Sequence, residues 1–200
     1  MKKLFYSVMV AVTMLLATNN TQAQAWSKDA KVLGIGIGGS SFFHVSNTYY
    51  GNSFYQPVTG QLNFTGEFGV HDYVGIGFTT GFGGRPGYTA SYGYGYYGGR
   101  YNYGYPELNV PIGVIANFHF FQLIADKTGK DIHSDKLDVY AGVNLGGGIA
   151  VLFGTSKSAI VPIAFGGVQA GARYYFTDKF GVNAEVGFPK LIHGGVVFKL

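Results

Sequence analysis

Hydrophobic and polar residues alternate along most of this chain, so that every second side chain is apolar. In Gln61–Val70, one set of alternate positions holds Leu, Phe, Gly, Phe and Val, and the other holds Gln, Asn, Thr, Glu and Gly. Phe180–Phe188 repeats the pattern. Because successive side chains point to opposite faces of a strand, these segments are predicted to be β-strands with one apolar face.

Segments with this alternation fit an antiparallel, eight-stranded, up-and-down barrel that crosses a membrane. Most of them reach the roughly 9–11 residues that a tilted transmembrane strand needs. Residues 70–73 and 177–180 are tight polar turns, whereas residues 43–58 and 85–104 are long connections. Outer-membrane barrels have short periplasmic turns and longer extracellular loops, so we expect both chain ends on the periplasmic side. The predicted strands are residues 32–42, 59–70, 73–84, 105–120, 137–148, 161–176, 180–188 and 191–200.

Residues 121–136 do not fit this scheme, because a short periplasmic turn is expected where the chain has a long connection. No pattern in the sequence explains its length. Several aspartates lie in or next to this stretch, but lysines interleave with them and the glycine of a calcium-binding loop is missing. We therefore interpret residues 126–138, which hold these aspartates, as a solvated turn rather than a metal site.

The first 25 residues have the features of a secretory signal peptide. Two lysines precede an apolar stretch over residues 4–17, and Ala23-Gln24-Ala25 matches the small-residue signal for cleavage. Thr21-Gln22-Ala23 is a second candidate cleavage signal. We predict a signal peptide over residues 1–25 and a barrel domain over residues 26–200, exported to the outer membrane of a Gram-negative bacterium.

The composition agrees with a membrane barrel and argues against several other classes of protein. Charged residues make up only 12% of the chain, about half of the roughly 25% that is usual in globular proteins. The net charge of +4 falls to +2 without the two lysines of the signal peptide, so we predict no nucleic-acid partner. Cysteine is absent from the sequence, which excludes disulfides and thiolate metal sites.

The polar positions of the predicted strands separate a membrane barrel from a soluble one. A water-facing exterior carries about 25–35% charged residues, but these positions are mostly Gly, Asn, Gln, Thr and Tyr. We therefore expect the apolar positions to face outer-membrane lipid and the polar positions to fill a narrow lumen. A soluble exported ligand-binding barrel, with the two faces exchanged, remains the less favoured alternative.

Three stretches resemble a known family. Pro106–Ile115 is similar to its fourth strand, Gln169–Asp178 with Phe180–Gly187 to a later hairpin, and Gly194–Leu200 to its last strand. The family is that of the small porin-like or OmpA-like outer-membrane β-barrel proteins of Bacteroidetes-type bacteria. The resemblance spans the mature chain, and it implies a fold rather than an activity.

Charged residues on the polar face suggest an ion network inside the lumen. Glu67, Arg173 and Glu185 all lie on that face near the same end of the predicted barrel. Because an unpaired ion in a narrow interior is costly, we expect Arg173 to bridge the two glutamates. The network is interpreted mainly as a structural plug, with a gate for ions as the alternative.

Nothing in the sequence marks a catalytic, metal or cofactor site. The five histidines lack the spacing of metal ligands, and the glycine pattern of Gly34–Gly39 lies inside a strand rather than between a strand and a helix. We predict no catalytic residue, no metal and no cofactor, and hence no enzyme. A Ser–His pair that forms only in the fold, with His119 or His193 as the base, stays open.

The connection over residues 85–104 contains the most unusual composition in the chain. Eight of the 16 tyrosines lie between Tyr88 and Tyr105, and a mixture of tyrosine and glycine is typical of binding loops. We predict a structural or surface-recognition barrel whose loops bind an extracellular protein or glycan; a small pore or transport channel is the alternative. The candidate recognition residues are Tyr92, Tyr94, Tyr96, Tyr97, Arg100, Tyr101 and Tyr103.

Overall fold

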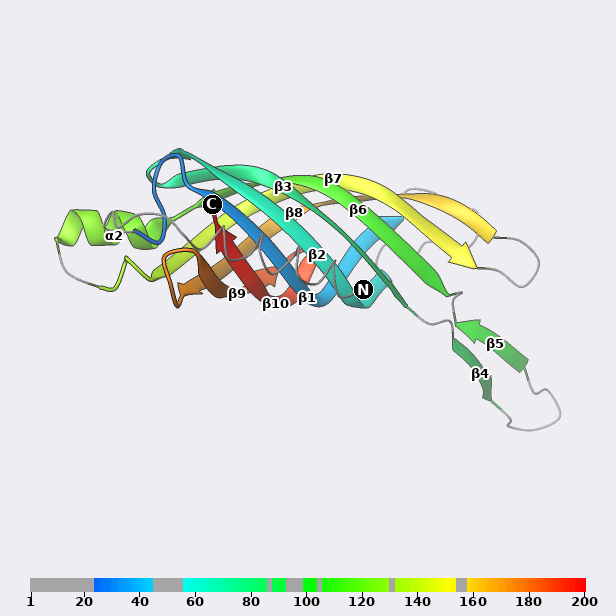
Figure 1. The fold of residues 1–200 in the computed structure, drawn as a ribbon. Coiled ribbons are helices and arrows are strands. Elements are labelled where there is room, and N and C mark those ends of the chain that lie inside the picture. Colours follow the sequence, from blue (N-terminus) through cyan, green and yellow to red (C-terminus); the bar gives the residue numbers. More distant parts are fainter. Residues whose placement is uncertain are drawn as a thin grey trace, which may run out of the picture.

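The computed structural model describes residues 24–44, 56–85, 88–92, 99–103, 106–129, 132–153 and 158–200. Eight antiparallel strands close into a barrel in the order β1-β10-β9-β8-β7-β6-β3-β2, which confirms the predicted fold class (Figure 1). The barrel strands are β1 (Lys31–His44), β2 (Gln56–His71), β3 (Val74–Arg85), β6 (Glu107–Phe118), β7 (Leu137–Phe153), β8 (Ser158–Tyr175), β9 (Phe180–Gly187) and β10 (Lys190–Lys199).

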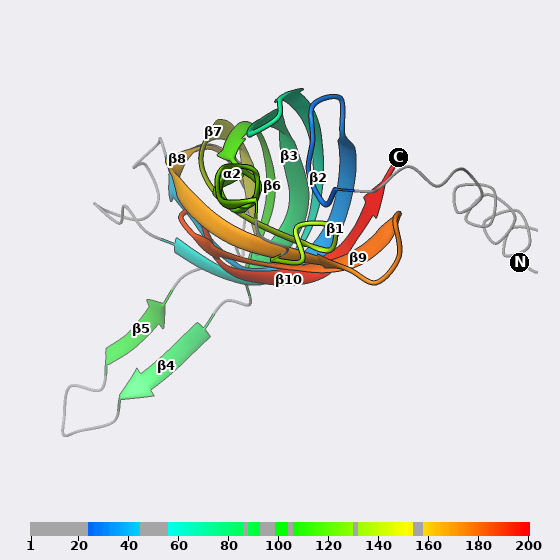
Figure 2. The same ribbon diagram turned by 90° about the vertical axis from the view of Figure 1, so that its left-hand side faces the viewer.

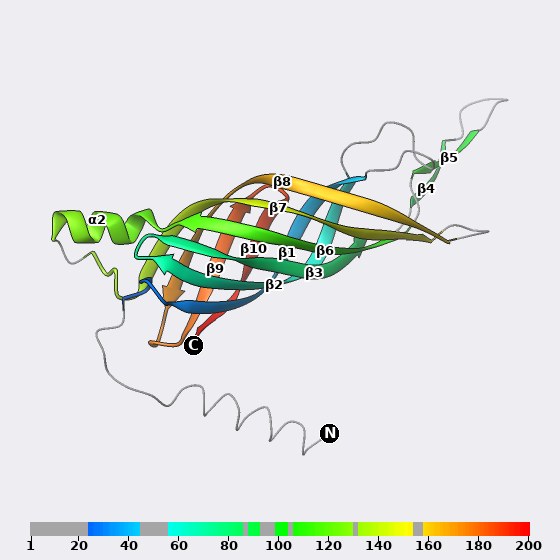
Figure 3. The ribbon, with the colours of Figure 1, turned by 90° about the horizontal axis from the view of Figure 1, so that it is seen from above.

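A separate two-stranded sheet stands beyond one end of the barrel. Its strands are β4 (Tyr88–Tyr92) and β5 (Gly99–Tyr103), which pair antiparallel with each other. The short helix α2 (Phe120–Thr128) lies at the opposite end of the barrel, as do the first described segment of the chain, in blue, and the C-terminus (Figure 3). We call these two ends the β4–β5 end and the α2 end.

The two-residue period of the sequence appears directly as an apolar outer wall and a more polar interior. Leu145 is 66% exposed and Ile160 is 69% exposed, although both belong to regular strands. The inward positions of the same strands hold small or polar side chains, such as Asn144 next to Leu145. Figure 2 looks along the barrel from the α2 end and shows the ring of strands around this interior. The alternation therefore sets the radial arrangement of the molecule.

The β9–β10 hairpin is shorter than the strands on either side of it, and its tip is tied to both of them. The backbone N–H of Ser41 donates to the carbonyl of Pro189 at 2.8 Å, and that of Phe188 donates to the carbonyl of Val168 at 2.8 Å. Beyond the tip, β1 pairs directly with β8 through Phe43 opposite Ala164. The wall therefore stays closed between the tip of this hairpin and the β4–β5 end.

The long connection over residues 121–136 contains a helix, and the predicted solvated turn over residues 126–138 is right only for residues 132–136. The chain forms α2 there, which ends at Gly129 in the left-handed conformation (φ 61°), and then turns back to β7. Gln122 and Ala125 of α2 are buried, so the helix rests against the barrel rim. Within the described residues, no helix is both long enough and apolar enough to cross a membrane.

Candidate functional site

Four ionisable side chains meet inside the barrel near the α2 end and form a closed ring of contacts. Arg173 of β8 donates from Nη2 to Glu67 of β2, and from Nη1 to Asp138 Oδ2 of β7 at 3.3 Å. His119, which follows the last residue of β6, contacts the same two carboxylates, Glu67 Oε1 at 3.0 Å and Asp138 Oδ1 at 2.7 Å. All four side chains are buried. We call Glu67, Arg173, Asp138 and His119 the charge ring.

The geometry of the charge ring favours the protonated form of His119. Both nitrogens of His119 face carboxylate oxygens, which only accept hydrogen bonds when ionised. An imidazolium donates from both nitrogens, so two cations then balance two anions. Burial lowers the pKa of His119, but the hydrogen bonds to Asp138 and Glu67 outweigh it and raise this pKa above its usual range.

Glu185, the third residue of the predicted network, lies outside the charge ring. Its carboxylate accepts hydrogen bonds from Lys190 Nζ at 3.0 Å and from the hydroxyl of Tyr140 at 2.7 Å. The ring of Tyr140 lies 4.3 Å from the guanidinium carbon of Arg173, so it stands between the two groups. The expectation that Arg173 bridges Glu67 and Glu185 is therefore wrong for Glu185, while the contact between Arg173 and Glu67 is present.

The residues that sequence reasoning missed are the remaining members of this cluster. Asp138 pairs directly with Arg173 across the β7–β8 ladder, and its place on the polar face was the available signal. Tyr140 and Lys190 are buried in the same interior. Gly75 leaves room for the cluster, because a Cβ there would collide with Glu67 Oε1 and with the ring of Trp26.

Trp26, the single tryptophan of the chain, covers the charge ring at the α2 end. Its ring stacks on His119 with 3.5 Å between centroids and 5° between planes, and the side chain is fully buried. The guanidinium carbon of Arg173 lies 5.9 Å from the Trp26 ring. The segment that carries this side chain has no period of its own, so the alternation of the sequence could not indicate its position.

A second polar group lies further along the interior and brings a serine next to a histidine. His193 Nε2 lies 3.1 Å from Ser40 Oγ and 2.9 Å from the carbonyl oxygen of Gly39, and the amide of Asn63 lies 2.8 Å from Nδ1. Because a carbonyl oxygen only accepts, Nε2 carries the hydrogen and cannot take a proton from Ser40. The pair that the sequence left open is thus formed, but without the geometry of an activated nucleophile.

Several amide side chains line a small internal cavity in the same region. The cavity has a volume of about 10 Å³, which is enough for about one water molecule. Gln61 is fully buried, and neither of its side-chain polar atoms has a protein partner; the same is true of Asn109. The lining residues include Ser40, Gln61, Asn63, Thr79, Asn144 and Gln169.

Toward the β4–β5 end the interior becomes apolar. Phe42, Ala150, Ile163 and Phe165 form a buried cluster, in which the rings of Phe42 and Phe165 lie 5.6 Å apart. Among the described residues, no group of three or more histidine, aspartate or glutamate side chains has the geometry of a metal site.

The predicted recognition residues fall on the β4–β5 hairpin or beside it. Tyr92 lies in β4, and Arg100, Tyr101 and Tyr103 lie in β5. The other three predicted residues lie outside the described residues; these are Tyr94, Tyr96 and Tyr97.

No protein-family model matches the sequence, and no curated protein matches it. Among solved structures, the outer membrane protein OprG from Pseudomonas aeruginosa is similar over 90% of this chain and 99% of its own, with 10% identity and a TM-score of 0.51. The N-terminal β-barrel domain of Pseudomonas aeruginosa OprF is similar over 87% of this chain and 98% of its own, with 13% identity and a TM-score of 0.48. The likeness to OprG shows a shared fold, that of a small outer-membrane β-barrel protein. The expected relation to Bacteroidetes-type proteins stays a prediction.

Proposed function

We propose that this protein is an integral outer-membrane β-barrel protein with a mostly filled lumen, exported with a cleaved signal peptide, and that it serves a structural or surface-recognition role. The observation that carries the proposal is the distribution of polarity across the wall. Apolar side chains such as Leu145 and Ile160 are exposed on the outside, while the ions of the charge ring are buried inside. Hydrocarbon requires this arrangement, because exposed ions there are expensive.

The orientation in the membrane follows from the two ends of the barrel. The first described segment of the chain, the C-terminus and the tight turn between β2 and β3 lie at the α2 end, which we assign to the periplasm (Figure 3). The β4–β5 hairpin lies at the other end, which we assign to the outside of the cell. This assignment gives short periplasmic turns and places the two long connections, which follow β1 and β3, outside the cell, as in outer-membrane barrels. The connection that contains α2 is the exception.

Two separate layers of side chains support the proposal that the lumen is mostly filled. The charge ring occupies the interior near the α2 end, and the apolar cluster that contains Phe42 and Phe165 occupies it near the β4–β5 end. A barrel of about eight strands is just wide enough for side chains to fill it. We propose that the protein is not an enzyme, because its Ser40–His193 pair is buried next to a cavity of about 10 Å³, too small for a substrate.

The recognition role is assigned to the β4–β5 hairpin, with an extracellular protein or glycan as ligand. The hairpin extends beyond the barrel wall, and β4 pairs with β5 rather than with a wall strand. Its sequence has the tyrosine and glycine of binding loops. This role is tested by measuring how well cells bind to arrays of glycans and surface proteins. Cells that carry the wild-type chain are compared with cells that carry a chain without residues 88–104. Equal binding by the two kinds of cell would reject the role.

The membrane location is tested by fractionation and by gel migration. We expect the protein in the outer-membrane fraction, extracted only by detergent, with a migration that changes on heating because the folded barrel resists the denaturant. A protein found in the soluble periplasmic fraction would contradict the proposal and favour the soluble ligand-binding barrel.

A small pore is the second candidate function, and the unpartnered amides of Gln61 and Asn109 favour it, since they would suit a water-lined path. Planar-bilayer recording of the purified protein distinguishes the two candidates. We expect no steady conductance from the wild-type barrel, because the charge ring and Trp26 fill the interior near the α2 end. Regular single-channel steps in the wild type would instead support the pore.

A further inference from the structure

Residues 24–30, which we call the N-terminal segment, are built into the α2 end of the barrel. The backbone N–H of Ala25 donates to the carbonyl of Ser134 at 2.8 Å, in the turn between α2 and β7. Asp29 and Ala30 exchange backbone hydrogen bonds with Gly69 of β2, both at 2.8 Å. The segment is thus fixed on two sides of the barrel before β1 begins.

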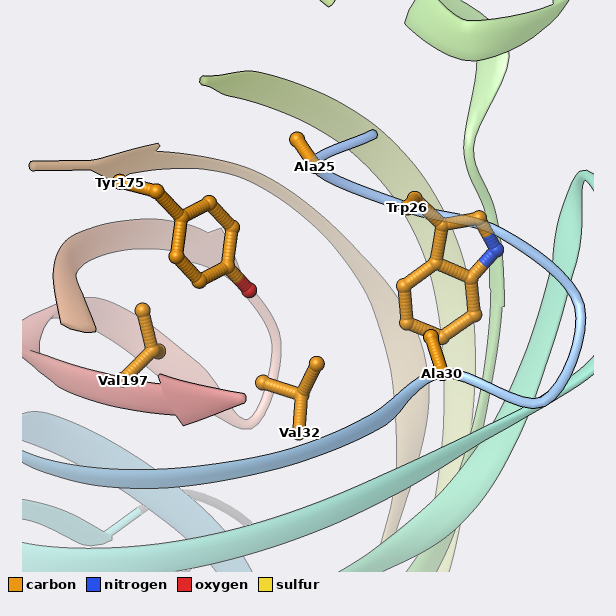
Figure 4. Packing of buried hydrophobic residues seen from close by; sticks show 6 residues of the cluster. All are labelled: Ala25, Trp26, Ala30, Val32, Tyr175 and Val197. Carbon is orange, nitrogen blue, oxygen red and sulfur yellow. The ribbon is translucent and has the colours of Figure 1, made fainter. Parts of the chain in front are cut away.

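The side chains of the N-terminal segment belong to the buried core. Ala25 is 2% exposed and Trp26 is fully buried, and both pack with Ala30 and Tyr175 in one apolar cluster (Figure 4). Lys199 of β10 donates from Nζ to the carbonyl of Gln24, and it lies 3.5 Å from the carbonyl oxygen of Ala25. Gln24 and Ala25 therefore contribute contacts of the folded barrel.

These contacts bear on which of the two candidate cleavage signals is used. Cleavage after Ala25 would remove the contacts with Ser134 and Lys199. It would also create an α-ammonium on Trp26, where the Ala25–Trp26 peptide bond now lies in the buried cluster. Ala25 and Trp26 are both buried at that point, so the new charge would lose its contact with water.

We infer that the signal peptidase hydrolyses the bond between Ala23 and Gln24, so that Gln24 is the first residue of the mature protein. Water adds its hydroxyl to the carbonyl carbon of Ala23, and the nitrogen of Gln24 takes the proton and leaves as the new amino group. Gln24 is exposed, so this ammonium stays in water. The signal used is Thr21-Gln22-Ala23, and the inference rests on the export that we propose above.

The intact mass of the protein purified from the cell envelope tests this site. We expect the mass of a chain that begins at Gln24, which is heavier by one Gln and one Ala than a chain that begins at Trp26. A mass that begins at Trp26 would overturn the inference and leave the proposed function standing. A mass that retains residues 1–23 in the folded membrane protein would overturn it together with the proposed cleavage of the signal peptide.

Two matched substitutions separate the candidate signals without depending on folding, because the mass is measured on the denatured chain. Thr21→Glu damages only the signal that ends at Ala23, and Ala25→Glu damages only the signal that ends at Ala25. We expect Ala25→Glu to be processed at the wild-type bond, and Thr21→Glu to accumulate as precursor or to be cut two residues later. The reverse pattern would reject the inference.

A comparison of two mature chains tests the structural reason. Chains that begin at Gln24 and at Trp26 are refolded in the same detergent, and their thermal unfolding is followed. We expect the chain that begins at Trp26 to melt several degrees lower. Equal melting temperatures would show that Gln24 and Ala25 add nothing to the fold, which would remove the argument for the upstream site.

Discussion

Arg173 and His119 hold the same two carboxylates from opposite sides, so each member of the charge ring has two partners within it. Removing one partner from a buried ion pair leaves an uncompensated charge, which costs more than the pair itself contributes. The ring is closed by residues from β2, β7 and β8 and from the end of β6. It therefore links four of the eight wall strands through their side chains.

Arg173→Met should lower the free energy of unfolding by about 3–5 kcal/mol, because Glu67 and Asp138 lose a charged partner in the barrel interior. Equilibrium unfolding of the refolded protein in urea measures this change. Lys127→Met is the matched control, since Lys127 is exposed on α2 and should change the stability by less than about 0.5 kcal/mol. Similar values for the two variants would show that the charge ring is not coupled to folding.

The stability that His119 contributes should fall as the pH rises. Its pKa in the folded protein is raised, so the contribution is fully present below the unfolded pKa of about 6.5. It is lost as the pH rises through the folded pKa. Unfolding free energies measured from about pH 6 to pH 9 for the wild type and for His119→Gln should converge toward the alkaline end. A constant difference would contradict the protonated state of His119.

Part of the charge ring could be predicted from the sequence. The other contacts could not, because they depend on strand register and on side chains that lie between the charged groups. Glu67 and Arg173 share the polar face and the same barrel end, which is enough to expect their contact. The pairing of Asp138 with Arg173 depends on the register of the β7–β8 ladder, which the alternation alone does not fix. Glu185 pairs with Lys190 rather than with Arg173, because the ring of Tyr140 separates it from Arg173.

At the scale of the elements, each wall strand could be found because it carries its own two-residue period. The hairpin between β7 and β8 is longer than predicted, since β7 ends at Phe153 and β8 begins at Ser158. Ala150 and Leu152 are buried apolar residues on the inner face there, so both faces are apolar and the alternation disappears. Helix α2 has only 9 residues, too few for a clear helical period.

Replacing residues 88–104 by a short Gly/Ser linker should leave the barrel folded, because β4 and β5 pair only with each other among the described strands. Migration of the unheated sample on a gel, compared with the heated one, measures the folded fraction. Replacing residues 24–27 is the contrasting change, since it removes the buried Trp26, and it should reduce that fraction. Loss of folding in the first variant would show that the hairpin is part of the barrel architecture.

For the molecule as a whole, the radial distribution of polarity is the reverse of that in a soluble barrel, and a single substitution can test it. Leu145→Arg on the outer wall should cost about 2–4 kcal/mol of folding free energy in lipid vesicles if its position is near the middle of the bilayer. Ile124→Arg is the matched control, because Ile124 is an exposed apolar residue of α2 outside the wall. If both variants fold as well as the wild type in vesicles, the outer wall does not face hydrocarbon.

The short β9–β10 hairpin determines the diameter of the barrel at the β4–β5 end. Near the α2 end the circumference contains eight strands, whereas beyond the hairpin tip, where β1 meets β8, it contains six. Barrel diameter grows with strand number, so the wall tapers like a funnel toward the β4–β5 end. Lengthening this one hairpin would break the direct pairing of β1 with β8, place β9 and β10 between them and widen that mouth. The length of this single hairpin therefore determines how wide the barrel is at the β4–β5 end.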